Sequence, residues 1–362
     1  MRSFGALALA FVVSLVACGG DEGSVPAEQA PPANGGSGPA APGGAPAGGK
    51  PTAPAASGEV KTDLHVRVFG SPSDPPVVFV HGGPGASAYS FESTAAEALA
   101  ARGNFVVTYD QRGGGRSPKG TAADYSFAKA TQDLEDVIRS LHLSAPVLLG
   151  HSFGGALALE LLELHPGVAR GAVIVSSPLS FPDSYANIHD RCIDLYEKTF
   201  AFGKVAQMEA LHARMFPKGL TAPYSFSGAD IATTMESALD CLLYFSSSPS
   251  LDAASTWATL LADSKSELVT NVSTDVGAGY QANDELSYID LGPLYEKHKE
   301  RLFAIHGSDD GLYSEKDKAR AAQILGASHF TTIRDAGHDS FIDEPDAIML
   351  AITGYFAQLR AK

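Results

Sequence analysis

Short apolar runs alternate with longer helical patterns over most of the chain from residue 60 onward. Several runs are apolar at every position, which is typical of strands buried on both faces of a parallel sheet. The alternation therefore predicts an α/β fold, with a mostly parallel sheet and helices on both faces. The expected strands are LHVRVF at 64–69, PVVFV at 76–80, FVVTY at 105–109, PVLLG at 146–150, AVIVSS at 172–177, RLFAIH at 301–306 and HFTTIR at 329–334. Helical patterns lie at 94–103, 131–143, 153–166 and 345–360.

The alternation stops between residues 179 and 292. This stretch contains helix-compatible pieces, such as ATTMESALDCLLYF, and no strongly strand-like run. An inserted helical cap explains it better than a helical extension packed elsewhere, because ligand sites in such sheets lie at the strand ends, where caps also sit. We expect a core formed by residues 59–178 and 293–362 and a cap formed by residues 179–292.

The first 58 residues indicate export rather than part of the core. Residues 1–17 contain a largely apolar stretch that is too short to span a bilayer but has the form of a secretory signal. The sequence LVACG around Cys18 resembles the lipobox of bacterial lipoproteins, which implies lipidation of Cys18. An ordinary signal peptide with a chance cysteine is the alternative. Residues 18–58 are rich in Gly, Pro and Ala and are expected to form a flexible tether.

The expected location is therefore the bacterial cell envelope, where a lipid anchor alone holds the protein to a membrane. The glycine after Cys18 favours the outer membrane. A net charge of −15 without a basic stripe argues against nucleic acid as a partner. Besides Cys18 the chain contains Cys192 and Cys241, which an oxidising compartment allows to form a disulfide, two buried free thiols being the alternative. The oligomeric state is not indicated.

A serine stands between an expected strand and an expected helix in the sequence Gly150-His151-Ser152-Phe153-Gly154. A G-x-S-x-G on such a turn lifts the hydroxyl above the sheet edge, and the glycines leave room for the sharp turn. The N–H groups at the start of the following helix favour negative charge that develops beside the serine. These features predict that Ser152 is a nucleophile rather than a helix-capping residue.

A serine nucleophile needs a base and a carboxylate that orients the base, and in this architecture they follow in the order acid, then histidine. The strand expected at 301–306 leads into Asp309 and Asp310, and the one at 329–334 leads into His338. The other histidines lie mostly in helices or along strands. His338 is therefore the expected base, and the spacing leaves both aspartates open as the acid.

The segment His81-Gly82-Gly83-Pro84-Gly85 follows another expected strand directly. Its exposed backbone N–H groups can approach a substrate oxygen, so we expect the N–H groups of Gly83 and Phe153 to form an oxyanion hole. A glycine-rich turn that only reverses the chain is the alternative. In DQRGGGRS at 110–117, an ion pair of Asp110 with Arg112 or Arg116 is expected to fix the loop beside the site.

Together, HGGPG at 81–85, YDQRGGGRS at 109–117 and the serine turn resemble the proline iminopeptidase branch of the α/β-hydrolases, over about residues 60–180 and 300–345. The resemblance implies an α/β-hydrolase fold, a serine aminopeptidase activity and Asp310 as the acid. It also implies that cap carboxylates hold the substrate ammonium group, for which Glu197, Glu236 and Asp240 are available. The serine turn, Gly150-His151-Ser152-Phe153-Gly154, differs from the G-G-S-W-G of that branch, and its form is shared by many esterases.

The expected function is hence release of N-terminal residues from small peptides through Ser152, His338 and Asp310, with an acyl-enzyme intermediate. A carboxylic-ester hydrolase with the same machinery is the alternative, and a binding lipoprotein without catalysis is a further one. The sequence has no HExxH and no cysteine–histidine ligand spacing, so we expect neither a metal nor another cofactor.

Overall fold

The structure is a computed structural model that describes residues 58–60, 63–267 and 273–361. In these ranges the centre is an eight-stranded sheet with the strand order β1-β2-β4-β3-β5-β6-β7-β8. Strands β1 and β2 join antiparallel, and β3 to β8 are parallel, which confirms the expected mostly parallel sheet. The strands are β1 Gly58–Val60, β2 Val66–Phe69, β3 Pro76–Val80, β4 Phe105–Tyr109, β5 Val147–His151, β6 Gly171–Val175, β7 Leu302–Gly307 and β8 Phe330–Ile333.

The seven expected strands all form, and β1 is an addition. Strand β1 begins at Gly58, so the expected tether range of 18–58 is one residue too long. This three-residue strand pairs with β2 at the edge of the sheet. It is too short to show an apolar pattern, so the sequence did not predict it. The expected signal peptide, Cys18 and the tether up to residue 57 lie outside the described residues.

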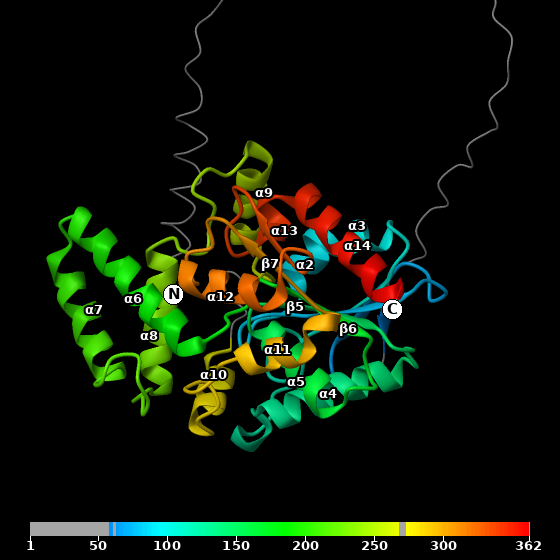
Figure 1. Ribbon diagram of the computed structural model, residues 1–362, viewed down its shortest axis with the longest axis horizontal. Helices are drawn as coiled ribbons and strands as arrows, with labels where there is room; N and C mark the ends of the chain where they lie inside the picture. The colour runs from blue at the N-terminus through cyan, green and yellow to red at the C-terminus, as the bar shows by residue number, and fades with distance from the viewer. Residues whose placement is uncertain (1–57, 61–62, 268–272, 362) are drawn as a thin grey trace, which may run out of the picture.

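Helices cover both faces of the sheet (Figure 1). Successive strand residues point to opposite faces, so that Val78 and Val80 pack into one apolar cluster and Val77 and Phe79 into the other. The first cluster contains residues of α4 Phe127–Ser140, α5 Phe153–Leu164, α11 Gly292–His298 and α12 Glu315–Leu325. The second contains residues of α2 Tyr89–Phe91, η1 Glu92–Ala96, α3 Glu97–Ala100, α13 Ser340–Asp343 and α14 Pro345–Ala361. The core also contains the short 3-10 helices η2 Ala122–Asp124, before α4, and η3 Lys299–Arg301, before β7.

Two core helices differ from their expected bounds. The helix expected at 131–143 is α4, which begins at Phe127 and ends at Ser140. The pattern at 94–103 corresponds to the continuous run of α2, η1 and α3, which begins at Tyr89 and ends at Ala100. Its first N–H groups are satisfied from far along the chain, because Ala88 N donates to Asp110 and Ser90 N to Glu267. Local sequence contains no signal for such a start.

Between β6 and β7, five helices in the described part of the chain lie within the range expected for the cap, ahead of α11 and η3. They are α6 Phe181–Lys198, α7 Phe202–Met215, α8 Gly228–Asp240, α9 Leu251–Ala262 and α10 Thr274–Ala282. Figure 1 shows α6, α7 and α8 projecting to one side of the sheet. The two connections to the core meet at Leu179, whose carbonyl accepts a hydrogen bond of 2.7 Å from Leu291 N. Among the helices of the described ranges, none has the length and apolar character needed to cross a membrane.

A disulfide joins Cys192 on α6 to Cys241 at the end of α8, with Cα atoms 5.7 Å apart. Both cysteines are buried. The helical pattern expected to continue beyond Cys241 breaks there, because Leu242 adopts a positive φ of 57°. Cys241 is the C-terminal cap of α8, so the disulfide joins α6 to the end of α8.

We predict that replacing both cysteines by serine lowers the free energy of unfolding by about 2–4 kcal/mol, because the cross-link restricts the unfolded chain. Thermal unfolding of wild type and Cys192→Ser/Cys241→Ser, with and without dithiothreitol, measures this. The reductant should lower the Tm of the wild type and leave that of the double variant unchanged. Equal Tm values for all four samples would contradict the prediction.

Candidate active site

Ser152 lies on a strained turn between β5 and α5. Its φ of 54° and ψ of −125° belong to a region that residues with a side chain rarely adopt. Ser152 N donates to the carbonyl of Val175 at the end of β6, which holds the turn against the neighbouring strand. Such strain persists only where surrounding structure imposes it, and here it aims the hydroxyl away from the sheet.

The glycines around the serine are required by close backbone approaches. A Cβ atom on Gly154 would lie 2.0 Å from the carbonyl oxygen of Val80, and one on Gly82 would lie 2.8 Å from Ser152 Cβ. Neither neighbour can move without disrupting β3 or the turn. The small residues thus bring the loop after β3 directly against the serine.

Asp310 and His338 form a buried pair at the ends of β7 and β8. Asp310 Oδ2 lies 3.1 Å from His338 Nδ1, and both side chains are almost fully buried. Burial would raise the pKa of Asp310, but the charge of His338 and its hydrogen bond lower the pKa below its usual value. Burial would likewise lower the pKa of His338, but Asp310 raises it above its usual value. Because the Nδ1–H donates to Asp310, Nε2 is left as the proton acceptor.

Asp309, the neighbour of Asp310 in the sequence, does not contact His338. Asp309 accepts a hydrogen bond of 2.7 Å from the backbone N–H of Ser247 and a further one from its hydroxyl. The structure thereby places Asp310, rather than Asp309, against His338.

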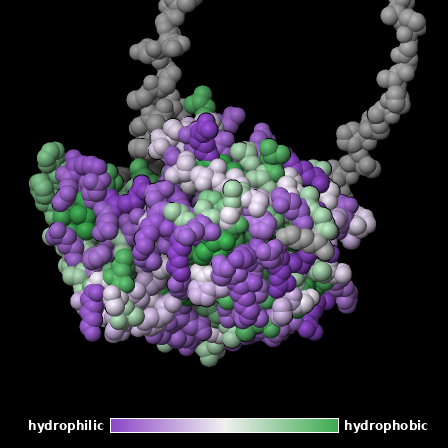
Figure 2. All heavy atoms as spheres, in the orientation of Figure 1, coloured by the Kyte–Doolittle hydropathy of each residue, from purple (hydrophilic) through white to green (hydrophobic). Residues whose placement is uncertain are grey.

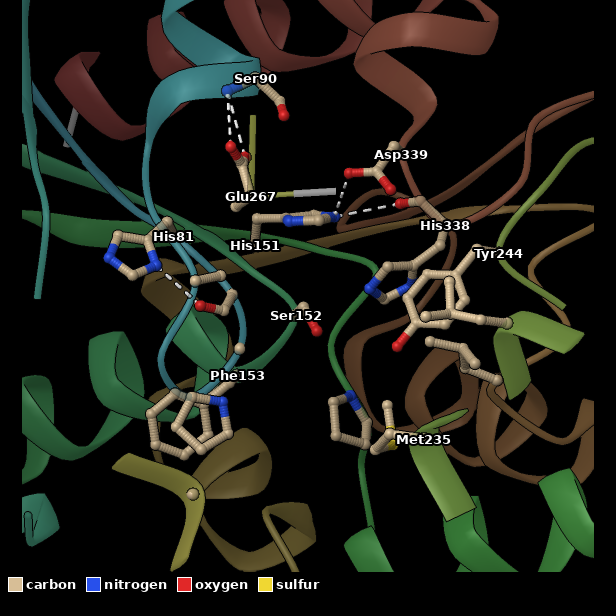
Figure 3. A pocket seen from close by; sticks show the side chains of 18 of the residues that line it. His81, Ser90, His151, Ser152, Phe153, Met235, Tyr244, Glu267, His338 and Asp339 are labelled. Atoms are coloured by element: carbon tan, nitrogen blue, oxygen red, sulfur yellow. Dashed lines mark hydrogen bonds and ion pairs between the residues drawn. The ribbon is translucent and has the colours of Figure 1, made fainter. Parts of the chain in front are cut away.

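Ser152 and His338 line one cavity of about 440 Å³ between the core and the cap. Figure 3 shows the Ser152 hydroxyl and the His338 ring facing the same space. The two side chains are not hydrogen-bonded to each other in this structure. Catalytic hydrogen bonds are often long before substrate binds, and the shared cavity meets the geometric need for a nucleophile and its base.

The two residues expected to form an oxyanion hole, Gly83 and Phe153, both lie beside the serine. Phe153 begins α5, so its N–H has no partner within the helix. Gly83 has a φ of 125°, and both residues line the cavity with Ser152. Within the described ranges neither N–H donates a hydrogen bond to the protein. Both are therefore free to bind a substrate oxygen.

The glycine loop is held by hydrogen bonds from the loop after β4. Gln111 N donates to His81 Nε2 over 2.8 Å, so the proton of this imidazole is on Nδ1, which donates to the carbonyl of Gly82. The Gln111 side chain also donates to the carbonyl of His81. Burial lowers the pKa of His81, which keeps the ring neutral and this arrangement intact.

The loop after β4 is itself fixed by an ion-pair network. Asp110 accepts from Arg116 over 2.7 Å, and Arg116 also binds Glu92 over 2.8 Å. Arg112 instead pairs with Asp133 on α4. Of the two partners considered for Asp110 in the sequence, Arg116 is the one the structure provides. Asp110, Arg116 and Glu92 do not line the cavity, and they support the glycine loop through Gln111.

His151 adjoins the pair of Asp310 and His338 and stays neutral. Its ring lies 4.9 Å from that of His338, and Nε2 donates to the His338 carbonyl over 3.1 Å. Burial lowers the pKa of His151 to about 3, and the charge of His338 adds to the effect. The ring therefore helps to position His338 without carrying charge.

The three cap carboxylates expected to hold an ammonium group differ in position. Glu236 and Asp240 line the cavity, whereas Glu197 does not. The expectation for Glu197 is wrong because the buried face of α6 contains Cys192 and Tyr196, which turns Glu197 outward into solvent. Asp240 is already paired with Lys204 and Tyr196, and so Glu236 is the one left unpaired by described residues.

Two further carboxylates line the cavity and were not anticipated from the sequence, Glu267 and Asp339. Glu267 contacts neutral donors, the Ser87 hydroxyl and the Ser90 N–H, and burial raises its pKa. Burial also raises the pKa of Asp339 to about 7 against the opposing charge of His338, and the neutral His151 ring lies 3.7 Å from its carboxylate. Figure 3 shows both carboxylates beside His151. The position of Asp339 directly after His338 could have indicated from the sequence that it lies near the site. No feature of the sequence indicated this for Glu267.

Comparison with known proteins places this geometry in a family. The protein-family model described as the alpha/beta hydrolase fold matches residues 75–345 of this chain. A proline iminopeptidase of Lactobacillus helveticus is 26% identical over 302 residues, which cover 82% of this chain and 95% of that protein. A putative carbamate hydrolase of Variovorax paradoxus is 32% identical, but the match spans 46% of this chain and 61% of that protein.

Solved structures agree on the fold. A proline iminopeptidase-related protein of Thermus thermophilus has a TM-score of 0.61 and 23% identity, covering 84% of this chain and 98% of that one. A putative aryl esterase of Burkholderia cenocepacia has a TM-score of 0.54 and 19% identity, covering 85% of this chain and 100% of that one. Given the match over most of its folded part, the chain belongs to the α/β-hydrolase family.

Proposed function

We propose that the chain is a serine aminopeptidase, similar to proline iminopeptidases, that releases the N-terminal residue of small peptides. The observation that carries the proposal is the placement of Glu267 and Asp339 in the cavity of Ser152 and His338. Buried carboxylates that contact neutral donors are costly to ionise, and a substrate ammonium group would supply the opposite charge. A free N-terminus contains that group beside the bond to be cleaved.

The cavity walls around these carboxylates are apolar, which favours a substrate whose N-terminal residue has an apolar side chain. Phe79, Phe91, Trp257 and Phe341 line the cavity together with Glu267 and Asp339. Phe91 stacks on Phe79 and meets Phe341 edge to face, which makes a firm apolar wall. Such a pocket favours an apolar residue whose amino group reaches the carboxylates.

In the proposed reaction, His338 Nε2 takes the hydroxyl proton of Ser152 as Oγ attacks the scissile carbonyl carbon. The carbonyl oxygen becomes negative and is held by the N–H groups of Gly83 and Phe153. His338 then gives the proton to the departing amine, which leaves an acyl-enzyme. Water attacks this ester with His338 as base and frees Ser152. Asp310 orients His338 and stabilises its charged form throughout.

A carboxylic-ester hydrolase is the second candidate. It is favoured by the cap side of the cavity, where Ile188, Ile231 and Met235 provide an apolar surface suited to an acyl or alcohol group. The L. helveticus relative is a proline iminopeptidase, whereas a diacylglycerol lipase of Danio rerio is also similar, at 32% identity over 128 residues. An ester and an amide pass through the same kind of tetrahedral intermediate, so the triad serves both.

Ser152 should react covalently with a fluorophosphonate probe, because a serine activated by His338 attacks phosphorus as it attacks a carbonyl. Ser152→Ala should abolish labelling, as judged by in-gel fluorescence and by mass spectrometry of the labelled peptide. Failure of the wild type to label would favour a binding protein without catalysis.

The acid limb of kcat/KM against pH should lie above about 6.5, the usual pKa of histidine, because Asp310 raises the pKa of His338. The base works only when neutral, so activity falls as the pH drops through the raised pKa. Asp310→Asn removes the charge, and we expect a shift of the limb to lower pH and a kcat lower by roughly 10³–10⁴-fold. An unchanged limb and rate in this variant would exclude Asp310 as the acid.

Alanine 4-nitroanilide should be cleaved in preference to propionic 4-nitroanilide, which differs only in lacking the amino group. Glu267→Gln and Asp339→Asn should each reduce this preference by roughly tenfold, because each removes one carboxylate from the ammonium group. Glu197→Gln is the matched control, since that cap carboxylate lies outside the cavity. A preference that survives both substitutions would show that Glu267 and Asp339 do not bind the ammonium group. Cleavage of esters alone would argue for the ester hydrolase.

A further inference from the structure

Trp257 is a buried tryptophan on α9 that forms part of the cavity wall. Leu261, one helical turn further along α9, lines the cavity as well, so one face of this helix is turned toward the substrate space. Trp257 is 2% exposed, and it is the only tryptophan in the chain. Its position and its large ring make it a candidate for limiting what the cavity can hold.

The indole of Trp257 is held by a hydrogen bond and by packing. Its Nε1–H donates to Asp343 Oδ1 over 2.7 Å, and both side chains are buried. The ring of Phe245 meets the indole at an interplanar angle of 61°, with the ring centroids 4.7 Å apart. Leu260 and Ile342 form an apolar cluster with it. A side chain locked by both kinds of contact keeps one orientation, so it presents a fixed wall to a substrate.

Trp257 lies on the side of the cavity that contains Glu267 and Asp339. Asp343, its hydrogen-bond partner, is the last residue of α13, and Asp339 is the N-terminal cap of the same short helix. Glu267 follows α9 in the chain and lines the cavity with Trp257. The amino group and the side chain of an N-terminal residue are bonded to the same carbon. An ammonium group held by these carboxylates therefore brings that side chain next to the indole.

The carboxylate that holds the indole also holds the turn before the base. Asp343 Oδ2 accepts a hydrogen bond of 2.7 Å from the backbone N–H of Gly337, which precedes His338. The cavity wall at Trp257 and the turn that contains His338 thus share one buried support. This arrangement fixes the distance between the wall and the reacting groups.

We propose that Trp257 sets the upper size limit of the N-terminal residue, so that aliphatic residues up to the size of leucine are released and phenylalanine is excluded. The inference rests on the proposed function, because it takes the side chain of the N-terminal residue to be the group that meets this wall. It extends that function by naming the class of residue released.

The other walls on this side of the cavity do not make room for an aromatic side chain. Phe91 stacks on Phe79 with their ring centroids 3.7 Å apart, and Phe341 meets Phe91 edge to face at 5.0 Å. A phenylalanine side chain would have to displace the indole of Trp257. That displacement breaks the bond to Asp343 and leaves a buried carboxylate oxygen without its donor, which is costly. A short aliphatic side chain makes no such demand.

The kinetic test compares wild type and Trp257→Leu on the 4-nitroanilides of alanine, leucine and phenylalanine. We expect wild-type kcat/KM for phenylalanine to be about tenfold or more below that for leucine, as for other pockets that select by size. Trp257→Leu should reduce this difference to about twofold or less, because leucine leaves free the space that the indole fills. The ratio of the two substrates is compared within each variant, so a general loss of activity does not affect it.

Met208→Ala is the matched control, since Met208 is also a buried side chain but does not line the cavity. The ratio should stay at the wild-type value in this variant.

Binding is measured separately in Ser152→Ala, which leaves the wall intact. Because Trp257 is the only tryptophan, its fluorescence reports directly on this part of the cavity. Leucine amide should change the emission and bind about tenfold more tightly than phenylalanine amide.

Three results would overturn the inference while the aminopeptidase stands. They are equal cleavage of the leucine and phenylalanine anilides by wild type, an unchanged ratio in Trp257→Leu, and emission that leucine amide leaves unchanged although wild type cleaves its anilide. Failure of the proposed function is recognised differently. Wild type would then cleave none of the three anilides and Ser152→Ala would bind neither amide, which overturns the inference together with the function.

Discussion

The hydrogen bond between Asp310 and His338 is the interaction on which the site depends. It joins the turns after two neighbouring parallel strands, β7 and β8, and lies out of contact with solvent. In such a place an unpaired carboxylate is strongly disfavoured, so each partner secures the position and charge of the other. The pairing selects the tautomer of His338, and through it the nitrogen that faces the cavity. Disturbing this pair would alter the base itself.

The glycine loop at 81–85 depends on a second chain of contacts, on the β3 side of the serine. Arg116 holds Asp110 and Glu92, the loop that contains Asp110 presents Gln111, and Gln111 fixes the His81 ring and backbone. All of these groups except Arg116 are buried, and each has its partners, which makes the loop rigid. The strained backbone of Ser152 is tolerated because β3, β5 and β6 hold the turn from both sides. Electrostatic stabilisation by backbone N–H groups requires this rigidity.

The molecular surface shows mixed hydrophilic and hydrophobic residues on the face seen in Figure 2. The apolar surface that matters for substrate lies inside the cavity, between the cap helices and the strand ends. The disulfide from Cys192 to Cys241 adjoins Leu239, Asp240 and Leu242, which line this cavity. The disulfide thus holds the part of the cap that lines the cavity near the end of α8.

Much of the fold was predictable because its signals are local. Strands such as β3 and β4 are apolar throughout, and a parallel sheet brings their carboxyl ends to one edge, which is why Ser152 and His338 could be assigned. Contacts between distant segments were not predictable in the same way. The place of Glu267 depends on how the turn after α9 meets α2, and the outward position of Glu197 depends on which face of α6 is buried.

The most direct measurement of the central claim is a crystal structure of the protein after inactivation by a 4-nitrophenyl phosphonate. The account predicts phosphorus bonded to Ser152 Oγ, one phosphonyl oxygen between the N–H groups of Gly83 and Phe153, and His338 Nε2 beside Oγ. Phosphorus on another residue, or a phosphonyl oxygen turned away from both N–H groups, would contradict it.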